Sequence, residues 1–237
     1  MRGAHKIISF ASLFWFKRQK RTMKAMDILR IMYAALVVLV ILLVAEVGWR
    51  KHWLNGEVGR KFVHITVGTF VAFWPLFLDW DDIRILSLAF FVVVLISMQL
   101  GFFRVIKSVL RPTYGEVFFA LSVGLLTIIT ASRAIYAVAI LQMALADGFA
   151  AIIGTRYGRE NKYHLFGRTK SVAGSLTFFV ISLALLIGYS LFSGAGLAWH
   201  YVVLAALGAT FIENIAALGF DNLVVPVGVA FLLTMVH

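Results

Sequence analysis

Cysteine is missing from the 237-residue sequence, which excludes disulfides and thiolate metal sites. Proline is scarce, with three residues, and charged side chains make up only 14% of the chain. Acidic residues are the rarer sign, 11 against 22 basic ones. No long linker, low-complexity stretch or convincing internal repeat divides the chain. These absences predict one continuous domain over residues 28–237, preceded by a basic N-terminal arm over residues 1–27.

Long apolar runs take the place of these missing features. Hydrophobic residues make up 62% of the chain, and the mean hydropathy is +0.93. Residues 85–103 hold no charge, and neither do residues 171–212, although Ser-Gly-Ala-Gly at 193–196 divides that run. About 20 apolar residues cross the hydrocarbon core, where backbone polar groups must be bonded internally, so helices are expected. Strand-period alternation is not visible, which argues against a membrane β-barrel.

The apolar runs predict an all-α fold: a polytopic integral membrane helical bundle of about seven to eight transmembrane helices. The eighth run is short and contains Pro226, so spanning, tilting and re-entering the bilayer all stay open for it. The predicted spans are 29–47, 62–78, 85–103, 117–132, 134–154, 172–192, 197–218 and 223–236.

Basic residues gather in every second loop between these spans, whereas the intervening loops hold only Arg84 and Arg133. By the positive-inside rule the basic face is cytoplasmic, and we expect a multi-pass protein of the cell (inner) membrane. The net charge of +11 then reflects loops that face anionic lipid headgroups, and no nucleic-acid partner is expected. The basic loop residues are Arg50, Lys51, Arg60, Lys61, Arg104, Lys107, Arg111, Arg156, Arg159, Lys162, Arg168 and Lys170.

The N-terminal arm disagrees with this topology, because it is also basic although it precedes the first span. Three explanations stay open. In the favoured one, translation starts at Met23 or Met26. In the second, the segment 7–16 lies in the membrane interface as an amphipathic anchor. In the third, the arm is a transit-like extension, since it lacks acidic residues before Asp27.

Carboxylates lie on the same basic face. Asp147 stands in an apolar run towards the end of the fifth span, and Glu213 and Asp221 stand where the seventh span ends. An ionisable group within a membrane costs about 2.5–3.5 kcal/mol near the bilayer centre, so it indicates a function. Asp147 with Glu213 or Asp221 is therefore the predicted Mg²⁺ site, although Asp221-Asn222 also fits a helix cap and turn.

Cations beside these carboxylates indicate an anionic ligand such as a nucleoside triphosphate. Arg168 and Lys170 are the favoured phosphate contacts. Arg60 and Lys61 lie one helical turn before His64, which predicts either a general base, a phosphate contact or a structural histidine bonded to a backbone carbonyl. The segment around Lys170 is not a Walker A loop, because it lacks the preceding glycine and the upstream spacing.

Two further patterns have simpler explanations. Gly154 and Gly158 share a narrow helix face with Asp147; such a face lets another backbone or a ligand come close, and it is also an ordinary helix-packing surface. At the opposite face of the membrane, Asp79, Asp81 and Asp82 are predicted to be solvated loop charges.

Four stretches resemble the CTP-dependent lipid-alcohol kinases, which include the dolichol, phytol and yeast-type diacylglycerol kinases. The third stretch runs into a Lys-Ser-x-x-Gly-Ser loop and also resembles the phosphatidate cytidylyltransferases, whereas Asp-Asn-Leu-x-x-Pro in the fourth fits the kinases. The chain departs from the family pattern at Ala146, where glycine commonly precedes the acid. The stretches are GRKFVHITVG (59–68), RPTYGEVFF (111–119), residues 146–179, and IENIAALGFDNLVVPV (212–227).

The resemblance implies a membrane kinase that transfers the γ-phosphoryl group of CTP to the hydroxyl of a lipid alcohol: phytol, a polyprenol or dolichol, or diacylglycerol. It implies Mg²⁺ as cofactor and membrane lipids as surroundings. The alternatives are a cytidylyltransferase-like enzyme and a non-catalytic anion or lipid transporter. The implied residues are Asp147, His64, Glu213 and Asp221 for catalysis; Arg168, Lys170, Ser171, Gly174, Arg60, Lys61 and Asn222 for the nucleotide and its phosphates; and Asp147, Glu213 and Asp221 for the metal.

Overall fold

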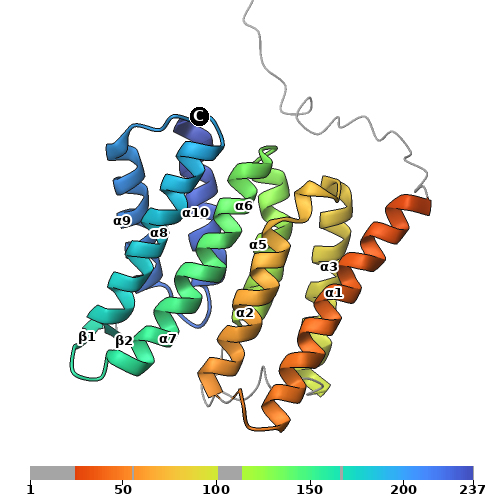
Figure 1. The fold of residues 1–237 in the computed structure, drawn as a ribbon, viewed down its shortest axis with the longest axis horizontal. Helices are drawn as coiled ribbons and strands as arrows, with labels where there is room; N and C mark the ends of the chain where they lie inside the picture. The colour runs from red at the N-terminus through yellow and green to blue at the C-terminus, as the bar shows by residue number, and fades with distance from the viewer. Residues whose placement is uncertain (1–24, 55, 101–113, 166–167, 237) are drawn as a thin grey trace, which may run out of the picture.

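A computed structural model describes residues 25–54, 56–100, 114–165 and 168–236, in which helices run up and down in a bundle (Figure 1). Each of the eight predicted spans overlaps a helix. The elements are α1 (Ala25–Arg50), α2 (Gly56–Ala72), η2 (Trp74–Leu76), α3 (Trp80–Leu100), α5 (Gly115–Ile129), α6 (Arg133–Leu141), η3 (Gln142–Ala146), α7 (Asp147–Tyr157), β1 (Lys162–Leu165), β2 (Arg168–Ser171), α8 (Val172–Phe192), α9 (Trp199–Ile215) and α10 (Asp221–Val236).

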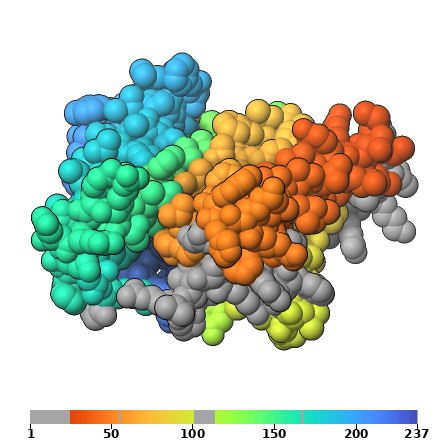
Figure 2. All heavy atoms as spheres, turned by 60° about the horizontal axis from the view of Figure 1, so that its bottom comes forward, coloured from red at the N-terminus to blue at the C-terminus, as the bar shows by residue number. Residues whose placement is uncertain are grey.

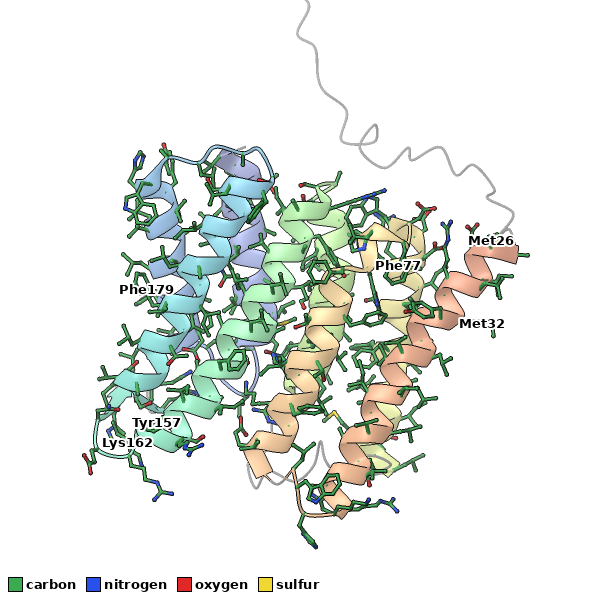
Figure 3. The ribbon with its side chains drawn as sticks, viewed as in Figure 1. Met26, Met32, Phe77, Tyr157, Lys162 and Phe179 are labelled. Atoms are coloured by element: carbon green, nitrogen blue, oxygen red, sulfur yellow. The ribbon has the colours of Figure 1, made fainter. Side chains whose placement is uncertain are left out.

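Among the described residues, four helices are long and apolar enough to cross a membrane: Ala25–Arg50, Trp80–Leu100, Arg133–Tyr157 and Val172–Phe192. The helices α5 and α10 are apolar but shorter. Large apolar side chains face outwards, as Met26 and Met32 do on α1 (Figure 3). The protein is thus a helical membrane protein, and the number of seven or eight spans stays a prediction.

The continuous rod of α6, η3 and α7 forms the centre of the bundle. In the most apolar 18-residue stretch of this rod, 56% of the residues are buried. The same share is 22% in each of the other three long apolar helices. Tyr136 on α6 and Phe178 on the neighbouring α8 are fully enclosed. The Ser132 hydroxyl begins the rod by accepting a hydrogen bond from the Ile135 amide. Asp147 therefore belongs to the most enclosed helix rather than to a peripheral one.

A π-helical turn, η3, interrupts this rod directly before Asp147. A π turn holds an extra residue, which rotates the residues after it relative to those before it. Its first residue, Gln142, is fully buried and donates from Nε2 to the Ser182 carbonyl on α8 at 3.1 Å. The turn thus sets the direction in which Asp147 points.

The expectation of an all-α fold misses a β-hairpin between α7 and α8. Strands β1 and β2 pair antiparallel, with Lys162 opposite Ser171 and Leu165 opposite Arg168. The segment is polar and lies between two helices, and pairing satisfies its backbone groups where no helix does. Ser171 then caps α8 by accepting from the Gly174 amide at 3.1 Å. The hairpin carries Lys170 back towards the bundle.

One expectation is wrong at the opposite end of the bundle. Asp82 is not a solvated loop charge: it is only 4% exposed, and its carboxylate accepts from the Asp79 amide at 3.2 Å. This bond caps the start of α3, where backbone amides have no partner within the helix itself. Asp81 remains on the surface, where it pairs with Arg84 at 2.8 Å.

The end of α1, the start of α2, the two strands and the α9–α10 connection lie at one end of the bundle, as the positions of the basic loops require (Figure 1). Figure 2 shows this end, with a hollow between the green-teal residues of α7 and the hairpin and the orange residues of α2; blue residues of α10 lie deeper inside. The predictions for the first 24 residues of the arm, and for the loop cations Arg104, Lys107 and Arg111, lie outside the described residues.

Candidate active site at the polar end of the bundle

Three carboxylates from three helices meet at this end. Asp147 begins α7, Glu213 lies in the last turn of α9, and Asp221 begins α10. One oxygen from each lies within 4.8 Å of the others, and Asp147 and Glu213 are buried. Three negative charges this close repel one another unless cations compensate them. The predicted metal-binding residues are thus brought together.

Lys61 on α2 compensates the first of these charges. Its Nζ donates to Asp147 Oδ2 at 2.5 Å, and the two side chains are only 4% and 8% exposed. A buried ion pair of this kind keeps its two side chains together, because separating them would leave each charge buried and uncompensated. Lys61, predicted to contact phosphate, directly positions the Asp147 carboxylate.

His64 lies one turn further along α2 and faces the same carboxylate. Its Nε2 lies 2.9 Å from the Met143 carbonyl and 3.4 Å from Asp147 Oδ2. A carbonyl oxygen only accepts, so this nitrogen carries the proton and Nδ1 is left as a proton acceptor. Of the three readings predicted for His64, the structure shows the bond to a backbone carbonyl, and it places the ring beside the acidic cluster; the roles as general base or phosphate contact stay predictions.

Lys170 on β2 compensates the second carboxylate. Its Nζ donates to Glu213 Oε1 at 2.5 Å and to the Glu213 carbonyl at 3.1 Å. Burial alone would lower the pKa of Lys170, but the attraction and hydrogen bond of Glu213 outweigh it and raise that pKa above its ordinary value. The raised pKa keeps Lys170 charged, and because the side chain is 22% exposed, a ligand can reach it from outside.

The other predicted residues hold varied positions. Arg60 pairs with Glu57 at 2.5 Å. Asn222 is buried beside Asp221 and donates from Nδ2 to the Gly115 carbonyl at 3.0 Å, while its Oδ1 has no partner among the described residues. Arg168 lies on β2, two residues before Lys170. Thus Arg60 lies on the α2 side of the cluster, and Arg168 lies on the hairpin side.

Ser171 and Gly174 act in packing. A Cβ placed on Gly174 would lie 3.1 Å from the Ala150 carbonyl, and one on Gly158 would lie 2.3 Å from Ser171 Oγ. The small face predicted on α7 is therefore where α7 meets the start of α8, as helix packing requires. This close approach brings the hairpin against the end of α7.

A hydrogen-bonded group that the sequence analysis did not predict joins the hairpin to α8 and α9. The Tyr163 hydroxyl lies 2.5 Å from Ser175 Oγ and donates to Asn214 Oδ1 at 2.9 Å. Ser175 donates to the same Asn214 oxygen at 2.8 Å. Asn214 follows Glu213, so the group fixes the α9 end against the strand that faces Lys170. The one sequence feature that could have pointed to this group is that Asn214 directly follows Glu213.

The carboxylate cluster suits a hard divalent cation. Oxygen ligands at about 2.1 Å from Mg²⁺ lie at most about 4.2 Å apart across the ion. Oxygens within 4.8 Å of one another need only small side-chain adjustments to reach this spacing. Lys61 and Lys170 supply two positive charges against three negative ones, which leaves a formal surplus of negative charge for the ion. Asp147, Glu213 and Asp221 thus fit Mg²⁺.

Comparison with known proteins gives several relatives over most of the chain. A protein named phytol kinase from Synechocystis sp. is 33% identical over 202 residues, covering 81% of this chain and 84% of the relative. A probable chloroplastic phytol kinase 2 from Glycine max is 32% identical, covering 77% and 68%. A probable chloroplastic phytol kinase from Zea mays is 31% identical over 213 residues, covering 77% and 69%.

No protein-family model and no solved structure matches the chain. The relatives nevertheless agree with the resemblance carried by the four sequence stretches, and their matches cover most of both chains. The chain belongs to the phytol kinase family.

Proposed function

We propose that the protein is a membrane kinase that uses Mg²⁺ to transfer the γ-phosphoryl group of CTP to the hydroxyl of an isoprenoid alcohol such as phytol. One observation carries the proposal: three carboxylates, each from a different helix, meet at one end of an apolar bundle with a lysine on either side. Phosphoryl transfer demands mainly positioning and charge compensation, which this arrangement supplies. The names of the relatives support a lipid alcohol as acceptor.

Asp147, Glu213 and Asp221 hold the Mg²⁺ in this proposal. The ion, when bound, neutralises phosphate charge and polarises the γ-phosphoryl group. Lys61 keeps the Asp147 carboxylate in a fixed position, and the Met143 carbonyl keeps the His64 ring in place beside it. The buried residues of α2 and α7 thus form the fixed part of the site.

The nucleotide approaches from the hairpin side. Lys170 is partly exposed and pairs with Glu213. An arriving phosphate oxygen can therefore replace the Glu213 carboxylate oxygen as the partner of its ammonium group. Arg168 on the same strand supplies a second cation. Arginine and lysine side chains of this kind neutralise phosphate oxygens in phosphoryl transfer. CTP as the donor follows from the resemblance to CTP-dependent lipid-alcohol kinases.

The acceptor alcohol approaches from the α2 side. The hydroxyl oxygen forms a bond to the γ-phosphorus, the bond between that phosphorus and the β–γ bridging oxygen breaks, and CDP leaves. The hydroxyl proton passes to Nδ1 of His64, the ring nitrogen that the Met143 carbonyl leaves available. The site faces the cytoplasm, because the cation-rich loops lie at this end.

The experiment uses detergent-purified full-length protein with Mg²⁺. Label from γ-labelled CTP should appear in phytol, and ATP should support less transfer. Chelation of the ion should abolish transfer, and added Mg²⁺ should restore it. Transfer of α-label into phosphatidate with release of pyrophosphate would instead establish a cytidylyltransferase. Ligand flux in proteoliposomes without nucleotide consumption would establish a transporter.

A further inference from the structure

An apolar groove leads from the membrane-facing side of the bundle to the α2 side of the site. It lies between α1, α2, α3 and α5 and encloses about 780 Å³ of empty space, its open side included. Apolar side chains form most of its wall, among them Leu42, Val67, Phe90, Val94 and Phe119. Among its described residues, polar side chains are confined to four positions, Arg60, His64, Ser97 and Glu116.

The polar residues of the groove lie at the end nearest the carboxylate cluster. Arg60, His64 and Val67 line it at i, i+4 and i+7 on one face of α2, so polarity falls along that helix away from the loop end. Glu116, in the first turn of α5, lies at the same polar end. His64 connects this end to the site, since its Nε2 is 3.4 Å from Asp147 Oδ2.

A smaller depression, with about 240 Å³ of empty space when its open side is included, extends the apolar wall further into the bundle. It shares Val67, Phe90 and Phe119 with the groove and reaches Val71 and Trp74. Along α2, the distance from Arg60 to Val71 is 11 residues, or about 16 Å at 1.5 Å per residue. The groove and the smaller depression thus follow one line of apolar side chains along α2, an elongated shape that matches a chain better than a compact ligand.

We propose that this groove holds the hydrocarbon tail of the lipid alcohol, with the hydroxyl at the polar end beside His64 and Glu116. The inference rests on the proposed kinase function and adds the site that recognises the acceptor. A single hydroxyl on a long apolar chain matches a track that is polar at one end only. Val93 lines the groove and is 50% exposed on the outside of α3, so a bilayer lipid can enter from the side.

This placement separates the two substrates. The tail and hydroxyl occupy the space between α1, α2, α3 and α5, whereas the nucleotide meets Lys170 on the hairpin. The two approach the carboxylate cluster from opposite sides, which brings an acceptor oxygen and a γ-phosphate together without crossing paths. Wall residues such as Val94 and Phe90 then set which chain lengths and branch patterns fit.

The test compares two equal substitutions on one helix. Val94 lines the groove and is 7% exposed, while Val92, two residues earlier, is 46% exposed and is not part of the wall. Val94→Phe should lower the ratio of kcat/KM for phytol to that for geraniol, a much shorter isoprenoid alcohol, by about tenfold or more. Val92→Phe should keep the wild-type ratio. An unchanged ratio in Val94→Phe would overturn the proposal.

Photolabelling of the wild-type protein tests the position of the tail without depending on whether the Val94→Phe variant folds. Wild-type protein in detergent is irradiated with an isoprenoid alcohol that carries a diazirine on its tail, and the labelled peptides are identified. Label should appear on α2, α3 and α5 and should be displaced by excess phytol. Label confined to α8 or α9, or label that phytol does not displace, would overturn the groove assignment. Failure of wild-type protein to phosphorylate any alcohol would instead overturn the kinase function.

Discussion

The two sides of the carboxylate cluster differ in how firmly they are built. On the α2 side, Lys61 and Asp147 are 4% and 8% exposed and belong to two packed helices. On the other side, Lys170 is 22% exposed and stands on a two-stranded hairpin. A buried pair on helices is fixed, whereas a cation on a short hairpin can exchange its partner. The first side suits positioning, and the second suits an arriving phosphate.

Asp147 belongs to both sides, because it pairs with Lys61 and also faces Glu213 and Asp221. Asp147→Asn keeps the volume but removes the charge, so phosphoryl transfer should fall by about 10³-fold or more. Asp81→Asn, at the opposite end of the bundle, is the matched control and should leave the rate unchanged. Labelled-phosphate transfer at saturating CTP measures both. Near-normal turnover in Asp147→Asn would remove the cluster from the chemistry.

Substitution of Lys61 tests whether the buried Lys61–Asp147 pair stabilises the α2 side of the site. Lys61→Met leaves the buried Asp147 charge unpaired and should destabilise the protein by about 3–5 kcal/mol. The double variant Lys61→Met with Asp147→Asn removes both charges and should recover most of that stability, but no activity. Lys51→Met, at an exposed lysine of the α1–α2 turn, is the control. Thermal unfolding in detergent measures these values, and additive losses in the double variant would contradict the pairing.

Lys170 tests the opposite side. Lys170→Met should raise KM for the nucleotide about 10- to 100-fold, since a charge-assisted hydrogen bond contributes about 1.5–3 kcal/mol, and should change KM for the alcohol little. Lys162→Met, on the partner strand and exposed, is the matched control. A larger effect on the alcohol KM than on the nucleotide KM would reverse the assignment of the two sides.

The pH dependence follows from the same lysine. The pKa of Lys170 is raised in the folded protein, so the stabilisation it provides is complete below the unfolded value of about 10.4 and is lost only as pH rises through the folded value. Lys170 therefore stays charged between about pH 6 and 9, and its contribution to the nucleotide KM should not change with pH over this range.

The helices and the carboxylates could be predicted from the sequence because both leave local signals. Apolar runs mark helices, and charges inside them mark a site, so Asp147, Glu213 and Asp221 could be grouped before their distances were known. The π turn over 142–146 has no such signal, because its residues are ordinary helix formers. The hairpin was missed because its short strands carry polar side chains without a clear period.

Pairing between distant residues was the hardest part to predict. The sequence placed Lys61 with the phosphate-binding cations, yet its partner is Asp147, 86 positions away. Likewise Tyr163 reaches Asn214, 51 positions away. Such pairs depend on how helices pack, which no local pattern encodes. Composition can therefore identify the cations of a site, whereas only the fold shows which of them hold a carboxylate and which remain accessible.

Tyr163 gives the smallest expected effect and shows how far the hairpin depends on its anchor. Tyr163→Phe removes the hydroxyl that contacts Ser175 and Asn214, which should cost about 1 kcal/mol and loosen the strand opposite Lys170. The nucleotide KM should rise a few-fold with kcat little changed. Tyr157→Phe, at a 60% exposed tyrosine at the end of α7 (Figure 3), is the matched control. If both variants kept the wild-type KM, the Tyr163 hydroxyl would not anchor the hairpin, and the accessible side of the site would depend on the Lys170–Glu213 pair instead.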